Sequence, residues 1–196
     1  MKTKLLFYSF VGLSLAVIGF LFLAPSFAGF RKAEVPSAIN TTLAAKFDEL
    51  SKNGNSSCSA AFRDSIPNMP DGKRIQGSCC SPMSMHRYSE QINGLEKYKT
   101  IPEIPPDPYD IDSSLAKKMM ANYDMQLTPD EQKAYDYAME HSMEKGPCCC
   151  KCWRWYVYGG LAKHLIKNQH FTGEQITQIW NLSDGCGGEG DHVDHS

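Results

Sequence analysis

The sequence has almost no net charge and no region dominated by one sign. Its 20 Lys and Arg residues nearly balance 22 Asp and Glu residues, which leaves a formal net charge of −2 at pH 7. The positive charges are scattered among the negative ones and form no run or stripe that would attract a phosphate backbone. The sequence therefore predicts no nucleic-acid partner.

Common enzymatic motifs are missing as well. There is no His-Glu-x-x-His, no Gly-x-Ser-x-Gly, no phosphate-binding glycine-rich loop and no Cys-x-x-Cys-His haem motif. Hydrolase and nucleotide-dependent activities thus find no support in the motifs. The sequence favours a role other than catalysis.

The longest apolar stretch lies at the N-terminus. After two lysines no charge appears up to residue 30, and the apolar part, 5–24, has about the length of a membrane-spanning helix. Because this run exceeds the usual apolar region of a signal peptide, we expect residues 1–30 to form a single N-terminal transmembrane anchor, with a signal peptide cleaved after Ala28 as the alternative. All eight cysteines follow it, which favours a domain outside the cytoplasm over a tethered cytosolic thiol protein.

Beyond residue 30 the sequence pattern is helical. Residues 31–36 resemble a linker, 37–186 one cysteine-rich helical domain with long loops, and 187–196 a flexible tail of Gly, Asp and His. Apolar spacing and capping residues predict helices at 37–53, 84–99, 113–120, 128–144, 153–167 and 172–184. No alternating strand pattern appears, and 55–82 is expected to be a long loop without periodic structure. The expected fold class is mainly α, and the Gly159-Gly160 pair predicts either close approach of another backbone or a kink.

Four of the eight cysteines fall within five positions, in the stretch Pro147-Cys-Cys-Cys-Lys-Cys152. Neighbouring residues reach disulfide geometry only with backbone strain, so these cysteines cannot all pair locally. What remains is a set of long-range bridges to Cys58, Cys79, Cys80 and Cys186, a metal site that takes thiolates from the cluster, or some of each. The stretch precedes a predicted helix, whose N-terminal dipole lowers thiol pKa values and favours metal ligation or nucleophilic chemistry.

A second stretch, Cys79-Cys80-Ser-Pro-Met83-Ser-Met85-His86, combines thiol, thioether and imidazole groups. Cys and Met together are ligand types that select Cu(I). The alternative is that Met83 and Met85 fill gaps in the core and that His86 lies on a polar helix face. Cys186, flanked by glycines after the last predicted helix, is placed to fold back on the cysteine cluster.

These features predict a membrane-anchored, extracytoplasmic protein that binds a soft or borderline metal for storage, delivery or sensing. Copper as Cu(I) is the first expectation and zinc the second, because only one Cys-x-x-Cys spacing is present whereas structural zinc sites usually use two. The expected ligands are Cys148, Cys149, Cys150, Cys152, Cys79, Cys80, Cys186, His86, Met83 and Met85.

Two other functions stay open. A thiol–disulfide redox protein would use Cys149 and Cys152, although the βαβ pattern expected of thioredoxin-like proteins is missing. A structural domain stapled by disulfides would bind another membrane protein through the 55–82 loop and the proline-rich strap at 101–108.

The stretch Pro147-Cys-Cys-Cys-Lys-Cys152 resembles the Pro-Cys-Tyr-Cys-Gly-Cys motif of a family of exported, membrane-attached bacterial proteins. Pro147, Cys148, Cys150 and Cys152 match, whereas Cys149 and Lys151 replace the family's Tyr and Gly. The preceding Lys133-Ala-Tyr-Asp-Tyr-Ala is also similar to the helix that leads into that motif. The family's lipoprotein signal and later cysteine pair are not matched. The resemblance implies an exported, membrane-attached, cysteine-rich protein and supplies no mechanism.

Overall fold

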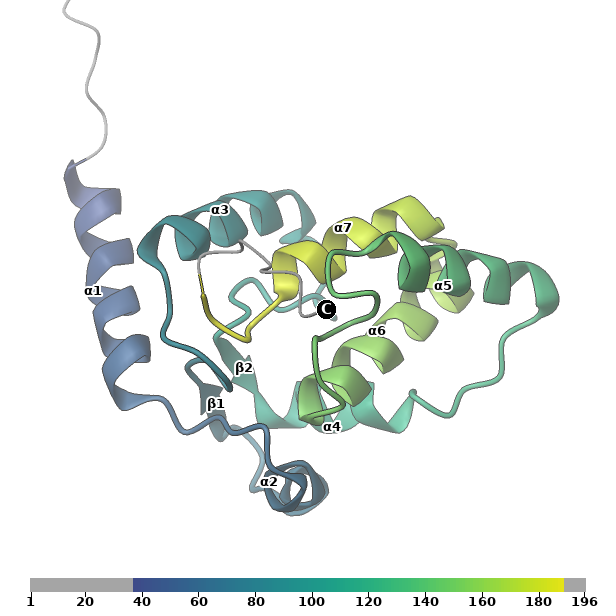
Figure 1. Cartoon of the computed structure of the whole chain (residues 1–196), viewed down its shortest axis with the longest axis horizontal. Helices are drawn as coiled ribbons and strands as arrows, with labels where there is room; N and C mark the ends of the chain where they lie inside the picture. The colour runs from purple at the N-terminus through teal and green to yellow at the C-terminus, as the bar shows by residue number, and fades with distance from the viewer. Residues whose placement is uncertain (1–36, 189–196) are drawn as a thin grey trace, which may run out of the picture. The chain divides into compact units, whose positions relative to one another are not determined.

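A computed structural model describes residues 37–188 of the chain (Figure 1). The predicted N-terminal anchor or signal peptide, the linker at 31–36 and the tail beyond Gly188 lie outside the described residues. Within the described residues the chain forms seven α-helices and one two-stranded sheet, so the prediction of a mainly α fold is confirmed. None of these helices combines the length and the apolar character that crossing a bilayer requires.

Five of the helices follow a residue whose side chain accepts a hydrogen bond from a backbone amide in the first turn. The bounds of the helices are α1 Ser37–Asn53, α2 Ala60–Ser65, α3 Met85–Leu95, α4 Ser113–Ala121, α5 Pro129–His141, α6 Trp153–Gln169 and α7 Gly173–Ser183, with 3-10 turns at Ile66–Asn68 and Glu96–Tyr98. Thr128 and Thr172 each form a complete capping box with the residue three positions later. All six predicted helices are present, although α5 ends at His141, earlier than the predicted residue 144.

The prediction of no strand is wrong for two short segments. β1, Arg74–Gln76, pairs antiparallel with β2, Asp110–Asp112, and places Ile75 opposite Ile111, both buried. Three residues are too few to show an alternating pattern, and the pairing joins segments far apart in the chain. The region 55–82 is likewise more ordered than predicted, because it holds α2 and β1; α2 has only six residues and buries none of them.

Helix α6 supplies much of the main core. Trp153, Val157, Leu161 and Leu165 are at most 1% exposed. α4 packs against α6, and α5 packs against both α6 and α7 (Figure 1). At Gly160 a Cβ atom would lie 1.9 Å from the carbonyl oxygen of a residue in α4. Of the two outcomes predicted for the glycine pair, the close approach of another backbone is therefore confirmed.

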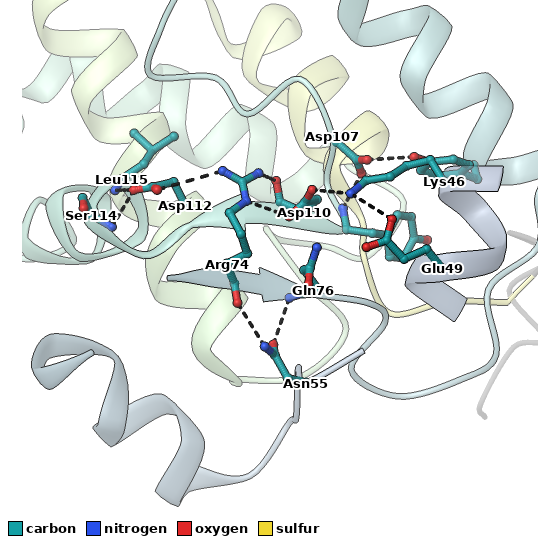
Figure 2. Close-up of polar contacts among 12 residues, drawn as sticks. Lys46, Glu49, Asn55, Arg74, Gln76, Asp107, Asp110, Asp112, Ser114 and Leu115 are labelled. Atoms are coloured by element: carbon teal, nitrogen blue, oxygen red, sulfur yellow. Dashed lines mark hydrogen bonds and ion pairs between the residues drawn. The ribbon is translucent and has the colours of Figure 1, made fainter. Parts of the chain in front are cut away.

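Hydrogen bonds and ion pairs connect α1 and the segment after it to the sheet (Figure 2). The Asn55 side chain donates to the Arg74 carbonyl oxygen at 3.0 Å and accepts from the Gln76 amide at 2.9 Å. Asp110 on β2 forms ion pairs of 2.8 Å with both Arg74 and Lys46 (Figure 2). These contacts fix the backbone that leads into Cys58.

Candidate metal centre

The cysteine-bearing segments converge on one cluster of sulfur atoms. Cys58 and the Cys79-Cys80 pair lie between α1 and α3, four cysteines lie in the loop between α5 and α6, and Cys186 follows α7. Within residues 37–188 the sulfurs form five groups of three, and in each group the sulfurs lie within 4.8 Å of one another. The groups are Cys58, Cys79 and Cys152; Cys58, Cys80 and Cys150; Cys79, Cys80 and Cys186; Cys148, Cys149 and Cys186; and Cys148, Cys150 and Cys152. Together these overlapping groups, here called the sulfur cluster, include all eight cysteines.

At the end of the cluster near α7 the sulfurs are in direct contact. The Cys186 Sγ atom lies 3.2 Å from that of Cys148 and 3.1 Å from that of Cys149. The Cys148 Sγ atom lies 3.6 Å from that of Cys152. Two thiolates on one tetrahedral zinc ion, with Zn–S bonds of about 2.3 Å, stand about 3.8 Å apart. The spacing thus suits ions bound between sulfurs after small shifts of the side chains.

Cys58 is the member that the sequence did not place in the ligand set. Its Sγ atom lies 2.7 Å from that of Cys80 and 3.6 Å from that of Cys150. Cys58 is isolated in the sequence, with no neighbouring cysteine, methionine or histidine to mark it. The only feature of the sequence that could have placed Cys58 in the site is that it is a cysteine, the one cysteine left outside the predicted ligand set.

Backbone hydrogen bonds join the segment that contains Cys79 to the segment that contains Cys186. The Cys79 amide donates to the Gly185 carbonyl oxygen at 3.3 Å, and the Ser81 amide donates to the Cys186 carbonyl oxygen at 2.8 Å. Gly187 has φ +86°, and a Cβ there would lie 2.1 Å from the Ser81 carbonyl oxygen, so only glycine fits. These contacts bring the segment after α7 against the Cys79-Cys80 pair.

Hydrogen bonds within the cluster lower the pKa values of some thiols and raise those of others. The thiols of Cys148, Cys152 and Cys186 stabilise a negative charge on Cys79 and lower the pKa of Cys79 below its usual range. Hydrogen bonds from Cys148 and then Cys186 lower the pKa of Cys149 to about 2. The pKa of Cys148, which donates to Cys149, is raised. The contacts therefore favour the thiolate form at Cys79 and Cys149, the form that binds metals and acts as a nucleophile.

A buried guanidinium lies next to the cluster. Arg154 in α6 is 1% exposed, and its Nη1 and Nη2 atoms donate to the Pro108 and Gly77 carbonyl oxygens at 2.6 and 3.2 Å. Burial opposes its charge, but the negative sulfur of Cys79 raises the pKa of Arg154 above its usual value. Arg154 thus joins α6 to the strap and to the end of β1 while placing a positive charge beside the sulfurs.

The three predicted ligands that are not cysteines occupy other surroundings. Met83 packs against a second, smaller core that contains Tyr88, and Met85 is 36% exposed. The His86 side chain is 84% exposed and lies 3.1 Å from a Glu90 carboxylate oxygen. None of the ligand groups within residues 37–188 includes His86. The placement of Met83 in a core and of His86 on a polar helix face matches the alternative described above, and their role as ligands stays a prediction.

The structure also gives the predicted redox pair separate partners. Cys149, which is exposed, contacts Cys186, whereas Cys152, which is buried, contacts Cys148. Cys152 is the N-cap residue of α6, without a side-chain capping hydrogen bond. Thiol exchange within this structure would thus join Cys149 to Cys186 more directly than to Cys152.

The donor set fits a soft metal, because every atom in the five groups is a sulfur. All eight cysteines are free of disulfide bonds in this structure. The resemblance to the Pro-Cys-Tyr-Cys-Gly-Cys family stays a prediction. The chain matches no protein-family model, no curated protein and no solved structure.

Proposed function

We propose that the sulfur cluster binds Cu(I), or zinc as the second choice, and that the protein stores, delivers or senses this metal. The observation that supports the proposal is the convergence of all eight cysteines, from separate segments of the chain, on five overlapping groups of three sulfurs. Thiols in such numbers have no packing advantage over ordinary apolar side chains, whereas as thiolates they form a multidentate soft-metal site.

The number of sulfurs in each group favours Cu(I) over zinc. Each ligand group within residues 37–188 contains three sulfurs, and none contains four. Structural zinc sites are almost always four-coordinate and tetrahedral, whereas Cu(I) accepts fewer thiolates. Because the groups share members, neighbouring ions would be bridged by common sulfurs. This arrangement supports several Cu(I) ions in one cluster.

We also propose that the domain is attached to a membrane and faces an extracytoplasmic compartment. The support comes from the sequence, in the apolar stretch of residues 1–30 and in the position of all eight cysteines after it. A membrane-attached metal carrier would exchange its ion with another protein at the membrane. Exposed Cys80 and Cys149 are the members of the cluster most accessible to a partner.

The test is elemental analysis combined with free-thiol counting on the full chain, purified once without oxygen and once in air. We expect copper in more than stoichiometric amount in the anaerobic protein after reconstitution with Cu(I). Cys79→Ser should lower this number, because Cys79 belongs to two of the groups and joins distant segments. Lys133→Gln is the control and should leave it unchanged, because this exposed side chain on α5 belongs to none of the five groups. Absence of metal together with absence of titratable thiols would overturn the proposal and favour the disulfide-stapled structural domain.

A second candidate function, thiol–disulfide exchange, is favoured by one observation. The exposed Cys149 has a pKa lowered to about 2 by hydrogen bonds from Cys148 and Cys186, and the Cys186 sulfur lies 3.1 Å away. In this function the Cys149 thiolate attacks a substrate disulfide and releases one substrate thiolate, after which Cys186 attacks the mixed disulfide and releases the other. Cys186→Ser should then trap a mixed disulfide on Cys149 that non-reducing electrophoresis detects. Failure to trap any adduct would exclude this candidate.

A further inference from the structure

Arg154 is a buried cation that pairs with no carboxylate in the part of the chain that the structure describes. Its side chain is packed over the Trp153 ring, with Cζ 4.6 Å from the ring centroid. Its two hydrogen bonds go to neutral backbone carbonyls, and its Nε atom has no hydrogen-bond partner. Within residues 37–188, Arg154 forms no ion pair with an Asp or Glu side chain. A fully buried charge is strongly unfavourable unless an opposite charge lies nearby.

The sulfur cluster is the group that lies nearby. The guanidinium sits directly on the backbone of Gly185, where a Cβ atom would lie 2.1 Å from Cζ. The carbonyl oxygen of the same Gly185 accepts a hydrogen bond from the Cys79 amide at 3.3 Å and lies 3.7 Å from the Cys79 sulfur. Cys186 follows immediately, and the Asp184 carboxylate that precedes the glycine accepts from the Cys186 amide at 3.0 Å. The guanidinium of Arg154 therefore packs against the segment that carries Cys186 and that is hydrogen-bonded to Cys79.

We propose that Arg154 is the counter-ion of the sulfur cluster: its buried charge stabilises the reduced sulfurs, which can carry negative charge as free or metal-bound thiolates, relative to disulfides, which cannot. A cysteine thiolate carries a negative charge and a disulfide carries none, so complete oxidation would leave the buried guanidinium uncompensated. Arg154 therefore stabilises the reduced cluster relative to the disulfide form. The guanidinium is suited to this role because it is charged at every physiological pH.

Arg154 also favours a monovalent over a divalent metal ion in the sulfur cluster, an inference that rests on the proposed function. Three thiolates around one monovalent cation keep two negative charges, whereas around a divalent cation they keep one. A permanent neighbouring positive charge stabilises the more negative complex more strongly. Arg154 thus favours Cu(I) over zinc in the sulfur groups closest to it.

The first experiment needs no metal and measures the thiol–disulfide equilibrium of the full chain with glutathione. In this reaction two cluster thiolates give two electrons to glutathione disulfide, form one protein disulfide and, with two protons, yield two glutathione thiols. The variants are Arg154→Lys, which keeps the charge, Arg154→Gln and Arg154→Met, which remove it, and Lys133→Gln, which removes an exposed charge on α5 that pairs with Asp130. Circular dichroism checks the fold of each variant.

We expect the neutral variants at position 154 to shift this equilibrium toward the disulfide form by at least about tenfold, and Arg154→Lys and Lys133→Gln to stay within about threefold of the native chain. Equal shifts in the Lys and Gln variants, or no shift in a folded neutral variant, would overturn the proposal. Unfolding of the neutral variants alone, with a folded Lys variant, supports it. Unfolding of all three Arg154 variants points instead to a hydrogen-bonding role.

The second experiment measures the apparent affinity of the reduced proteins for Cu(I) in competition with a chromophoric chelator at neutral pH. Replacing protonated thiols by a metal–thiolate complex makes the cluster more negative, so loss of the Arg154 charge should weaken binding by at least about tenfold. Equal Cu(I) affinities of the native chain and a folded neutral variant would contradict the inference. A native chain that binds no Cu(I) would instead overturn the proposed function, while the glutathione experiment would still decide the role of Arg154.

Discussion

Substitution of Gly185 by alanine should destabilise the domain by pushing against the buried guanidinium. The added Cβ atom would lie 2.1 Å from the Cζ atom of Arg154 and 2.2 Å from its Nη1 atom. Ordinary contacts between such atoms are about 3.5 Å, so the guanidinium or the backbone would have to move by more than about 1 Å. Gly185 is not in the left-handed region, and alanine therefore adds no backbone strain of its own.

The magnitude follows from the hydrogen bonds that the displacement breaks. The guanidinium donates to the Pro108 and Gly77 carbonyl oxygens at 2.6 and 3.2 Å. Hydrogen bonds from a charged donor contribute about 1.5–3 kcal/mol each, so losing one or both costs about 2–5 kcal/mol. Replacing glycine by alanine restricts the unfolded chain and returns about 0.4–1 kcal/mol. We expect a net loss of about 1–5 kcal/mol in the free energy of unfolding.

Urea unfolding of the full chain, followed by circular dichroism with a reductant and a metal chelator present, measures this loss. Gly72→Ala is a matched control, because Gly72 has φ +77° and no atom within 4 Å of the added Cβ, so it should cost only the strain of about 1 kcal/mol. A double-mutant cycle with Arg154→Lys should reveal a coupling of at least about 1 kcal/mol, since the smaller head relieves the clash. A Gly185→Ala protein within about 0.5 kcal/mol of the native chain would refute the reasoning.

Three further predictions concern the cluster and the fold. At pH 6 a short treatment with iodoacetamide should label Cys149, whose pKa is lowered to about 2 by the Cys148 and Cys186 thiols. It should spare Cys80, which is also exposed but whose pKa is raised to about 12 by partial burial; labelling of both at one rate, seen by mass spectrometry, would contradict this. Gly160→Ala should cost at least about 2 kcal/mol in urea unfolding, because its Cβ meets a backbone oxygen that cannot rotate away, despite the better helix propensity of alanine. Asp110→Asn should lose about 1–2 kcal/mol at pH 7, and this loss should shrink as the solution is made acidic. Burial opposes the charge, but two cations hold the pKa of Asp110 below its usual value, so its contribution is present above the unfolded pKa and is lost as pH falls through the lower folded pKa. A difference that stays constant from pH 7 down to the acid limit of folding would exclude the ion pairs as its cause.

Local signals determined the helices. The capping boxes at Thr128 and Thr172 and the apolar spacing of α6 depend on residues three or four positions apart, so each could be found from its own segment. The sequence also identified the chemistry of the site, because cysteines in such density have few uses other than metal ligation, redox chemistry or cross-linking. It placed seven of the eight cysteines in one predicted ligand set, and the structure brings those seven together.

The tertiary structure decided what depends on contacts between distant segments. It added Cys58 to the cluster, paired Cys149 with Cys186, and joined β1 to β2. None of these contacts has a periodic or local signature, because each forms only when packing of the helices closes long loops of the chain. The position of Arg154 shows the same limit. Its place in a helix was predictable from local spacing, but its burial beside the sulfurs follows only from the way α6, the strap and the end of α7 pack together.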